Sequence, residues 1–455
     1  MRVGPLPFSH SQPPRVRDLT LTIVTMRPLH AVMVRRATPR LAELLAAALD
    51  GTGPAILPLD AGLPAGRLAR LIGALGPGSI EDAEAVTTAR SGPSRGVAEG
   101  TAVVVGTSGS TGAPKGVELS AAALRYSARA SLDRVGARPG ERWLCCLPAT
   151  HVAGLQVLVR SLVSGTEPAL AERADAESLA VSGCAHVSLV PVQLRRLLEG
   201  PDGRAALAGF SSVLLGGAAA PAGLLATARA ARVPVVTTYG MTETCGGCVY
   251  DGVPLDGVRV EIRDDERIWI AGPVLFSGYL QGGSGGMGPS QGGSGGMGPP
   301  GRNIGGVTGG VAPPGASTAW FRTGDLGRLD ASGRLTVRGR ADDVINTGGH
   351  KVIPGEVAAA LQACPGVSDV AVVGQPDPEW GERVIAVVVP ANPADPPALE
   401  LLRMHVRERL PRYAAPSRVV LVDAVPMLPS GKHDIVRLRQ ELLRREQTEA
   451  ENVSY

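Results

Sequence analysis

The stretch that decides the fold is Ala102-Val-Val-Val-Gly-Thr-Ser-Gly-Ser-Thr-Gly-Ala-Pro-Lys115-Gly116. Its leading apolar residues predict a buried β-strand, and the glycines and hydroxyls that follow predict a loop. Glycine lets the backbone approach phosphate closely, hydroxyl and backbone N–H groups donate to phosphate oxygens, and lysine adds positive charge. The stretch therefore predicts a strand that ends in a phosphate-binding loop.

Three other interpretations of the loop are weaker. A P-loop NTPase, which would hydrolyse ATP without an added acid, needs Gly-Lys-Ser/Thr at the start of a helix. Here Lys115 follows proline and precedes glycine. A flexible linker would not follow an apolar strand or contain Pro-Lys-Gly. A non-catalytic nucleotide sensor would be expected to lack Glu243 or Lys432, and the chain has both.

Lysine is rare in this chain. Only three of the 45 basic residues are lysine, and Lys115, Lys351 and Lys432 each lie beside glycine or one residue from it. A compact, mobile ammonium and a rigid guanidinium are not interchangeable at a tight site. Lysine is also a common phosphate ligand. We therefore expect the three lysines to mark the sites of phosphate and carboxylate chemistry.

Length and charge limit the class of protein. With 455 residues and 44% hydrophobic content, the chain can form about two to four domains. The net charge of +3 comes from charges spread along the sequence, which favours neither nucleic acid nor a membrane surface as partner. No run approaches the roughly 20 apolar residues of a membrane helix, and the start lacks signal-peptide features.

The six cysteines do not suggest a disulfide framework in a chain of this length, so a reducing cytoplasm is expected. Cys245 and Cys248 have CxxC spacing. No second CxxC or nearby histidine pair completes a zinc site, so buried structural cysteines are the better interpretation.

The pattern of elements predicts an α/β protein. From about residue 100, apolar strands such as 187–190 and 212–215 alternate with helical segments such as 221–231. This alternation is typical of a mostly parallel, doubly wound sheet, whose ligands bind at the carboxyl ends of the strands. Short alternating strands after Pro254 predict an antiparallel subdomain. From Ala341 onward the pattern indicates a small α+β domain.

We therefore predict three parts. Residues 1–33 form a disordered extension, with Met26 or Met33 as an alternative start; 34–340 form a large N-terminal domain; and 341–455 form a small mobile C-terminal domain. Residues 281–319 contain a tandem Gln-Gly-Gly-Ser-Gly-Gly-Met-Gly-Pro repeat and further glycine and proline. Ordering this insert would cost on the order of 40 kcal/mol with few apolar side chains in compensation, so we expect a disordered loop.

Five motifs in order carry a family resemblance. The loop at 106–116 resembles the phosphate-binding signature of the acyl-adenylate-forming superfamily, which includes acyl-CoA synthetases, adenylation domains and luciferases. The other motifs are Tyr239-Gly-Met-Thr-Glu243, Thr323-Gly-Asp325, Gly339-Arg-Ala-Asp-Asp343 and Pro429-Ser-Gly-Lys432. One short motif would be weak evidence, but five in sequence are specific.

The resemblance implies a role for each matching residue, with ATP and Mg²⁺ bound by the large domain. The phosphate loop would comprise Thr107, Ser108, Gly109, Ser110, Thr111 and Lys115. Glu243, with Thr107 or Thr242, would position Mg²⁺, a cation that prefers oxygen ligands. Adenine and ribose would be held by Gly217, Ala218, Ala219, Tyr239, Gly240, Asp325 and Arg340. Lys432 would stabilise the attack of the carboxylate on the α-phosphate.

The family also implies that the C-terminal domain swings between two poses. Asp342 matches the hinge, and Gly349 matches the residue that faces the pantetheine tunnel used by CoA. Lys432 would then serve only the first half-reaction. For Lys351 we expect a phosphate contact in the second pose.

The acid is suggested by a narrower resemblance. The segment Leu147-Pro-Ala-Thr-His151 and the run from Thr238 to Gly257 resemble 2-succinylbenzoate–CoA ligases of menaquinone biosynthesis. His151 would gate the passage between the ATP and acyl sites, and Arg160 is our candidate cation for the second carboxylate of that acid. A surface arginine and a structural histidine remain the alternatives.

The sequence also departs from the family pattern. Asp256-Gly257 replaces the usual Pro-Gly, and His433 replaces the apolar residue that usually follows the catalytic lysine. The expected product is 2-succinylbenzoyl-CoA with AMP and pyrophosphate. A ligase for another aryl or short acyl acid, or one that loads a carrier protein, is the alternative, and a homodimer is common among relatives.

Overall fold

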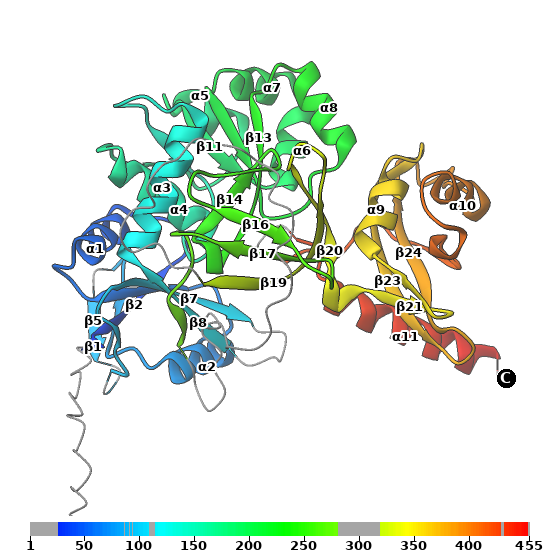
Figure 1. Ribbon diagram of the computed structural model, residues 1–455, viewed down its shortest axis with the longest axis horizontal. Helices are drawn as coiled ribbons and strands as arrows, with labels where there is room; N and C mark the ends of the chain where they lie inside the picture. The colour runs from blue at the N-terminus through cyan, green and yellow to red at the C-terminus, as the bar shows by residue number, and fades with distance from the viewer. Residues whose placement is uncertain are drawn as a thin grey trace, which may run out of the picture.

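The computed structural model describes residues 26–85, 87–90, 92, 94–108, 114–280, 319–428 and 432–453. Their strands form four larger sheets and one two-stranded ribbon. In Figure 1 the elements coloured blue to green form a large body, and the yellow-to-red elements after β20 lie to its right. No helix in the described part of the chain is long and apolar enough to cross a membrane.

The first seven-stranded sheet has the order β18-β8-β7-β3-β2-β4-β5. Its strands are β2 (Leu29–Val34), β3 (Ala55–Asp60), β4 (Ser79–Asp82), β5 (Thr87–Arg90), β7 (Thr101–Ser108), β8 (Pro114–Ser120) and β18 (Gly278–Leu280). The helices in this part of the chain are α1 (Pro39–Asp50) and α2 (Ala65–Leu75). β2 pairs in parallel with both β3 and β4, so it lies inside the sheet.

This position of β2 corrects one prediction. Residues 26–33, which we assigned to a disordered extension, form β1 (Met26–Arg27) and most of β2. β1 pairs with β6 (Val97–Ala98). The Leu29 and Val32 side chains of β2 are fully buried, because the helices and strands that follow in the chain cover them. Residues 1–25 lie outside the described residues.

The second seven-stranded sheet has the order β10-β9-β11-β12-β13-β14-β15. Its strands are β9 (Trp143–Cys145), β10 (Ala169–Leu170), β11 (His186–Leu189), β12 (Ser212–Leu215), β13 (Val235–Met241), β14 (Gly246–Tyr250) and β15 (Val253–Pro254). The first five strands in this order, β10, β9, β11, β12 and β13, pair in parallel. β14 and β15 are antiparallel to their neighbours. The predicted α/β class and parallel sheet are confirmed.

Helices separate the strands of this sheet. They are α3 (Ala121–Val135), α4 (Val152–Val163), α5 (Ala176–Val181), α6 (Pro191–Glu199), α7 (Pro201–Ala208) and α8 (Ala222–Ala230). The side chain of Ser120 accepts a hydrogen bond from the backbone N–H of Ala123 and so caps α3. Buried side chains of α1, α3 and α4 join the two seven-stranded sheets in one hydrophobic core.

The remaining two sheets follow in the chain. An antiparallel sheet contains β16 (Arg259–Ile262), β17 (Arg267–Ala271), β19 (Trp320–Leu329) and β20 (Leu335–Arg340), as predicted. The C-terminal sheet contains β21 (Ile345–Thr347), β22 (His350–Val352), β23 (Val367–Asp377), β24 (Gly381–Pro390) and β25 (Arg418–Leu421), with helices α9 (Pro354–Gln362), α10 (Leu399–Arg407) and α11 (Ile435–Val453). Short 3₁₀ turns are η1 (Thr242–Thr244), η2 (Ala341–Asp343) and η3 (Arg412–Ala414).

The strands after residue 340 pair only with one another within the described chain. This arrangement accords with a boundary at Arg340, which stays a prediction, as does the mobility of the C-terminal part. Of the glycine-rich insert predicted at 281–319, only Ala319 belongs to the described residues.

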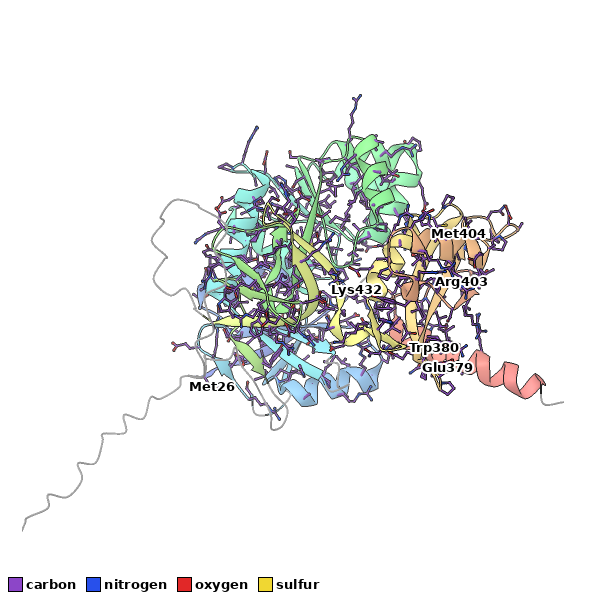
Figure 2. The ribbon with its side chains drawn as sticks, turned by 45° about the vertical axis from the view of Figure 1, so that its right-hand side comes forward. Met26, Glu379, Trp380, Arg403, Met404 and Lys432 are labelled. Carbon is purple, nitrogen blue, oxygen red and sulfur yellow. The ribbon has the colours of Figure 1, made fainter. Side chains whose placement is uncertain are left out.

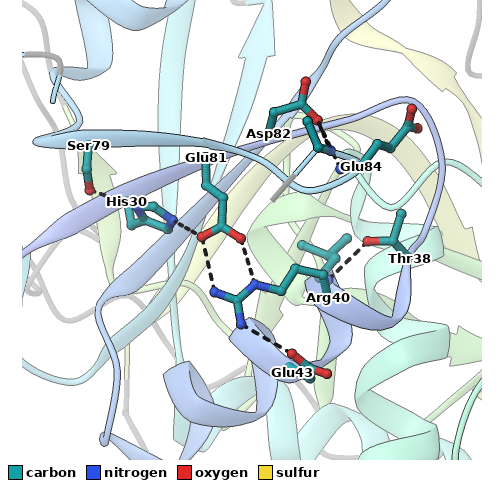
Figure 3. Close-up of polar contacts among 10 residues, drawn as sticks. His30, Thr38, Arg40, Glu43, Ser79, Glu81, Asp82 and Glu84 are labelled. Atoms are coloured by element: carbon teal, nitrogen blue, oxygen red, sulfur yellow. Dashed lines mark hydrogen bonds and ion pairs between the residues drawn. The ribbon is translucent and has the colours of Figure 1, made fainter. Parts of the chain in front are cut away.

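A buried charged cluster stabilises the first sheet (Figure 3). His30 of β2 lies 2.7 Å from the Ser79 hydroxyl through Nδ1 and 3.2 Å from the Glu81 carboxylate through Nε2. Arg40 of α1 donates to Glu81 over 2.6 Å. The Glu81 residue is only 3% exposed. The hydrogen bond from Arg40 lowers the pKa of Glu81 below its ordinary value, and that from His30 adds to the effect, although burial opposes both.

We predict that Glu81→Gln destabilises the protein by about 3 kcal/mol at pH 7, because the variant leaves the buried His30 and the partly exposed Arg40 without their anionic partner. In a thermal melt this loss lowers the Tm by at least about 5 °C. Since the pKa of Glu81 is depressed by folding, its contribution is complete above the unfolded carboxyl pKa of about 4.3 and decreases as the pH falls below that value.

Glu84→Gln is the matched control for this experiment. Glu84 lies nearby but is exposed, so its substitution should change the unfolding free energy by less than about 0.5 kcal/mol. Equal melting temperatures for Glu81→Gln and Glu84→Gln would contradict the stabilising role of the cluster.

Candidate active site

The phosphate loop joins two paired strands. Thr107 of β7 lies opposite Lys115 of β8 in the antiparallel register, and the Thr107 hydroxyl donates to the Lys115 carbonyl oxygen over 3.4 Å. Ser108 is the last residue of β7, while Gly109, Ser110 and Thr111 lie outside the described residues. The Lys115 ammonium lies 5.7 Å from the centre of the Tyr279 ring, close enough for a cation–π contact. A cation therefore stands at the base of the loop.

Glu243 lies next to this cation. It belongs to η1, directly after β13, and the Tyr279 hydroxyl donates to its Oε1 over 2.9 Å. Burial, and then the charge of Glu243, raise the pKa of Tyr279 above its ordinary value, so the phenol stays protonated as a donor. The Glu243 carbonyl oxygen also accepts from the Phe276 backbone N–H over 2.9 Å. The carboxylate is thus held in one orientation.

This arrangement fits Mg²⁺ held largely by a nucleotide. Mg²⁺ usually takes one or two carboxylates, with phosphates and water completing its coordination. Within the described residues no group of three or more His, Cys, Asp and Glu could form an all-protein site. Glu243 could supply one oriented carboxylate and Thr107 an additional oxygen, so the Mg²⁺ role of these two residues stays a prediction.

Two expected nucleoside ligands are joined directly. The Tyr239 hydroxyl of β13 donates to Oδ2 of Asp325 on β19 over 2.8 Å. The other carboxylate oxygen of Asp325 lies 3.6 Å from Nε of Arg340, which is its register partner on β20. Burial is the main reason why the pKa of Tyr239 is raised, and the Asp325 charge adds to it. Three predicted site residues from three strands therefore form one contact chain.

Two glycines, Gly217 and Gly240, shape the backbone next to this contact chain. Gly217 has a positive φ of 81°, and it leads with Ala218 and Ala219 into an exposed loop after β12. A Cβ atom on Gly240 would lie only 1.9 Å from the Gly246 carbonyl oxygen, so any side chain there would separate β13 from β14. Thr242 belongs to η1 beside Glu243. These loops lie at the carboxyl ends of β12 and β13, where parallel sheets bind ligands.

Lys432 lies at the junction between the large body and the C-terminal sheet (Figure 2). Asp325 and Arg340 both act on its charge. The pKa of Lys432 is lowered chiefly by partial burial and further by Arg340, whereas Asp325 opposes the shift. His151 occupies the N-cap position of α4, where its side chain makes no capping hydrogen bond, and it is within electrostatic range of Lys432. Burial, and then Lys432, lower the pKa of His151, whereas Asp60 raises it. The structure thus brings Lys432, His151, Asp325 and Arg340 into one region.

The residues expected to serve the second pose lie elsewhere. Gly349 has a positive φ of 77° and open space around its Cα, and Lys351 is exposed on β22. The neighbouring Gly348 N–H donates to the Trp380 carbonyl oxygen over 2.9 Å. Trp380 lies well away from Lys432 in Figure 2. Asp342, the expected hinge, lies 3.9 Å from both Arg267 and Arg340 and is mainly exposed.

Arg160 is buried, which excludes the alternative of a surface arginine. Its residue is 5% exposed, its Nη2 donates to the Ser188 hydroxyl over 2.9 Å, and its guanidinium lies 4.2 Å from the Trp143 ring centre. Nε has no hydrogen-bond partner, and no carboxylate of the described chain forms an ion pair with this side chain. Burial lowers the pKa of Arg160.

The CxxC cysteines lie in the core of the large body. Cys245 and Cys248 are fully buried and unpaired. Burial raises the pKa of both thiols, that of Cys248 to about 12. Thiolate is the reactive and metal-binding form, so these positions suit a structural role, which stays an interpretation of the sequence.

Tyr279 was missed by the sequence analysis. It lies two residues before the glycine-rich insert and 36 residues after Glu243, so no local pattern joins them. The chain has only six tyrosines. A rare tyrosine close to the glycine-rich insert was the one signal in the sequence that could have indicated a role for Tyr279.

We predict that Tyr279→Phe weakens binding of Mg²⁺–ATP about tenfold, because it removes a hydrogen bond to a charged carboxylate while keeping the ring. Calorimetric titration with ATP, in Mg²⁺ and in chelator, measures the effect, which should vanish in chelator. Tyr126→Phe is the control, since the hydrogen bond that the Tyr126 hydroxyl makes within the described residues goes to the Asp256 carbonyl oxygen and not to a carboxylate. Equal Mg²⁺ dependence in parent and Tyr279→Phe would contradict this role.

Comparisons with known proteins agree with this geometry. Residues 78–280 match the AMP-binding enzyme family and residues 356–432 the AMP-binding enzyme C-terminal domain. A probable 2-succinylbenzoate–CoA ligase of Mycobacterium tuberculosis is 41% identical over 438 residues, which cover 94% of this chain and 100% of that protein.

Two solved structures share the fold. E. coli MenE with a bound phenylether-linked analogue of OSB-AMS is 25% identical with a TM-score of 0.68, covering 92% of this chain and 89% of its own. The amide bond synthetase McbA of Marinactinospora thermotolerans is 26% identical with a TM-score of 0.73, covering 91% and 90%. The protein described here belongs to the AMP-binding enzyme family.

Proposed function

We propose that this protein activates 2-succinylbenzoate with ATP to its acyl-adenylate and transfers the acyl group to CoA. The products are 2-succinylbenzoyl-CoA, AMP and pyrophosphate, in menaquinone biosynthesis. The relative that is 41% identical along its full length supports the reaction and the acid. The observation that carries the choice of acid is the buried Arg160, whose Nε has no partner.

In the first half-reaction, the described residues position three anions. Thr107 and Lys115 would hold the β- and γ-phosphates, and Tyr239, Asp325 and Arg340 the nucleoside. Glu243 would hold Mg²⁺, which neutralises phosphate charge when bound. Lys432 would place its ammonium between the α-phosphate and the substrate carboxylate, stabilising the charge as the carboxylate oxygen attacks phosphorus in line and pyrophosphate leaves.

In the second half-reaction, the thiol sulfur of CoA bonds to the acyl carbon and AMP leaves. This step would take place in the second pose of the C-terminal domain, in which Gly349 would face the pantetheine arm and Lys351 would contact phosphate. Asp342 is suited to the hinge because it lies in η2, between the last strand of one sheet and the first of the next. The six unpaired cysteines fit a reducing compartment, and we place the enzyme in the cytoplasm.

The buried guanidinium of Arg160 suits a dicarboxylate. A buried charge without an anionic partner is costly, so a ligand carboxylate that reaches Nε would relieve that cost. One helical turn earlier on α4, Gln156 is also buried, and its Oε1 has no partner. The two residues share one face of α4 because they are four positions apart. Gln156 packs against Gly246 of β14, close to the Glu243 turn.

We predict that Lys432→Ala slows pyrophosphate release about 10² to 10³-fold, because it removes a preorganised donor for transition-state charge. ATP binding and the melting temperature should stay near parental values. Lys351→Ala is the matched control: it should keep parental pyrophosphate release and lose thioester formation. Comparable pyrophosphate release from Lys432→Ala and the parent would contradict the catalytic assignment.

A pair of acids tests the substrate assignment. 4-Oxo-4-phenylbutanoate is 2-succinylbenzoate without the ring carboxylate. The parent should prefer the dicarboxylate, and Arg160→Gln should raise the KM for the dicarboxylate by about 30-fold or more while changing that for the monocarboxylate little. Arg160→Lys, which keeps the charge, reports whether lost packing is responsible, and Arg196→Gln on the exposed face of α6 is the control.

Outcomes separate the claims. Activity with benzoate and none with 2-succinylbenzoate would overturn the choice of acid and favour a ligase for another aryl acid. Unchanged discrimination in Arg160→Gln would overturn the role of Arg160 alone. Acyl-adenylate formation without thioester formation on adding CoA would favour transfer to a carrier protein.

A further inference from the structure

His433 replaces the apolar residue that usually follows the catalytic lysine, and the proposed reaction gives His433 no role. It follows Lys432 directly, and its Nε2 lies 3.1 Å from Oδ2 of Asp369 on β23. Both side chains are about three-quarters buried. The contact with the Asp369 carboxylate restrains His433 and, through the chain, the backbone of the adjacent Lys432.

The backbone around Lys432 is also tied to its surroundings. The Leu428 N–H donates to the Lys432 carbonyl oxygen over 2.7 Å, and the Asp434 N–H donates to the Pro426 carbonyl oxygen over 2.7 Å. Met427 and His433 form a β-bridge. The His433–Asp369 contact therefore joins this small structure to β23, and any displacement of β23 moves Lys432 with it.

The residue before Asp369 makes a contact to the large body. The carbonyl oxygen of Ser368 accepts a hydrogen bond from Nη1 of Arg195 over 3.1 Å, across a sequence separation of 173 residues. Arg195 belongs to α6, which packs with the second seven-stranded sheet. Although burial raises the pKa of Asp369, its bonds to His433 and to the Val370 N–H and the charge of Arg195 lower it below its ordinary value. Asp369 thus stays ionised between two cationic or donor groups.

We propose that Arg195, Asp369 and His433 form a latch that positions Lys432 for the acid-activating step. In this latch His433 and Asp369 are positioning residues within the C-terminal sheet, and Arg195 is the contact that holds this sheet against α6. The inference rests on the proposed role of Lys432 in adenylation.

The two contacts differ in what they do during a change of pose. The His433–Asp369 contact lies within the C-terminal part and moves with it. The Arg195–Ser368 hydrogen bond links that part to the large body, so it must break when Gly349 replaces Lys432 at the reaction centre. A partly exposed hydrogen bond changes such an equilibrium only several-fold, which allows the latch to open in each turnover.

The test separates the two half-reactions. Pyrophosphate release from ATP and 2-succinylbenzoate measures the first, and thioester formation from supplied acyl-adenylate and CoA measures the second. His433→Leu and Asp369→Asn should lower kcat of the first about tenfold with little change in KM, and Arg195→Ala about threefold. All three should leave the second half-reaction at or above its parental rate.

Controls distinguish positioning from folding. His433→Gln keeps a side-chain donor and should recover part of the rate lost in His433→Leu. Arg196→Ala changes the adjacent exposed arginine of α6 and should leave both half-reactions unchanged. Melting temperatures within about 2 °C of the parent confirm that the variants fold.

Two results would overturn the latch. One is parental pyrophosphate release in both His433→Leu and Arg195→Ala. The other is an equal loss of both half-reactions in either variant, which would indicate a general structural role. A parent protein that releases no pyrophosphate with any acid, or a fully active Lys432→Ala, would instead overturn the proposed function together with the inference that rests on it.

Discussion

The contact chain from Tyr239 through Asp325 to Arg340 is the interaction on which the architecture of the site depends. It joins the end of a parallel strand, β13, to an antiparallel pair, β19 and β20, that comes from a different sheet. Arg340 is also the last residue of β20, and η2 follows it directly before the C-terminal sheet begins at β21. Arg340, which is expected to bind the nucleoside, therefore lies only two residues before Asp342, the expected hinge.

The charged residues of the site have different surroundings, and these surroundings suit the ligand that each residue is expected to bind. Lys115 lies over the Tyr279 ring, and the charge of Asp325 raises the pKa of Lys432 against the effect of burial. Glu243 is restrained by a neutral phenol, so its charge stays available to a cation. Arg160 is different, because it is buried without a carboxylate. A protein accepts such a cost most readily where a ligand supplies the missing anion.

The sequence predicted local features well because their signals are local. The strand predicted at 212–215 is β12, with the same bounds (Ser212–Leu215). The place of β2 in the first sheet was missed, since a six-residue apolar run does not reveal that β3 and β4 will flank it. Family motifs predicted the site residues, but not the contacts that orient them. The Tyr279–Glu243 and His433–Asp369 contacts join residues 36 and 64 positions apart, where periodicity carries no information.

The central claim is that the polar groups gathered around Lys432 perform adenylation of an acid. Exchange of labelled pyrophosphate into ATP measures that step directly, because it requires reversible formation of an acyl-adenylate and needs no CoA. The account predicts exchange that depends on both Mg²⁺ and 2-succinylbenzoate and that is lost in Lys432→Ala. ATP breakdown to ADP and phosphate without any acid, or exchange that persists in Lys432→Ala, would contradict it.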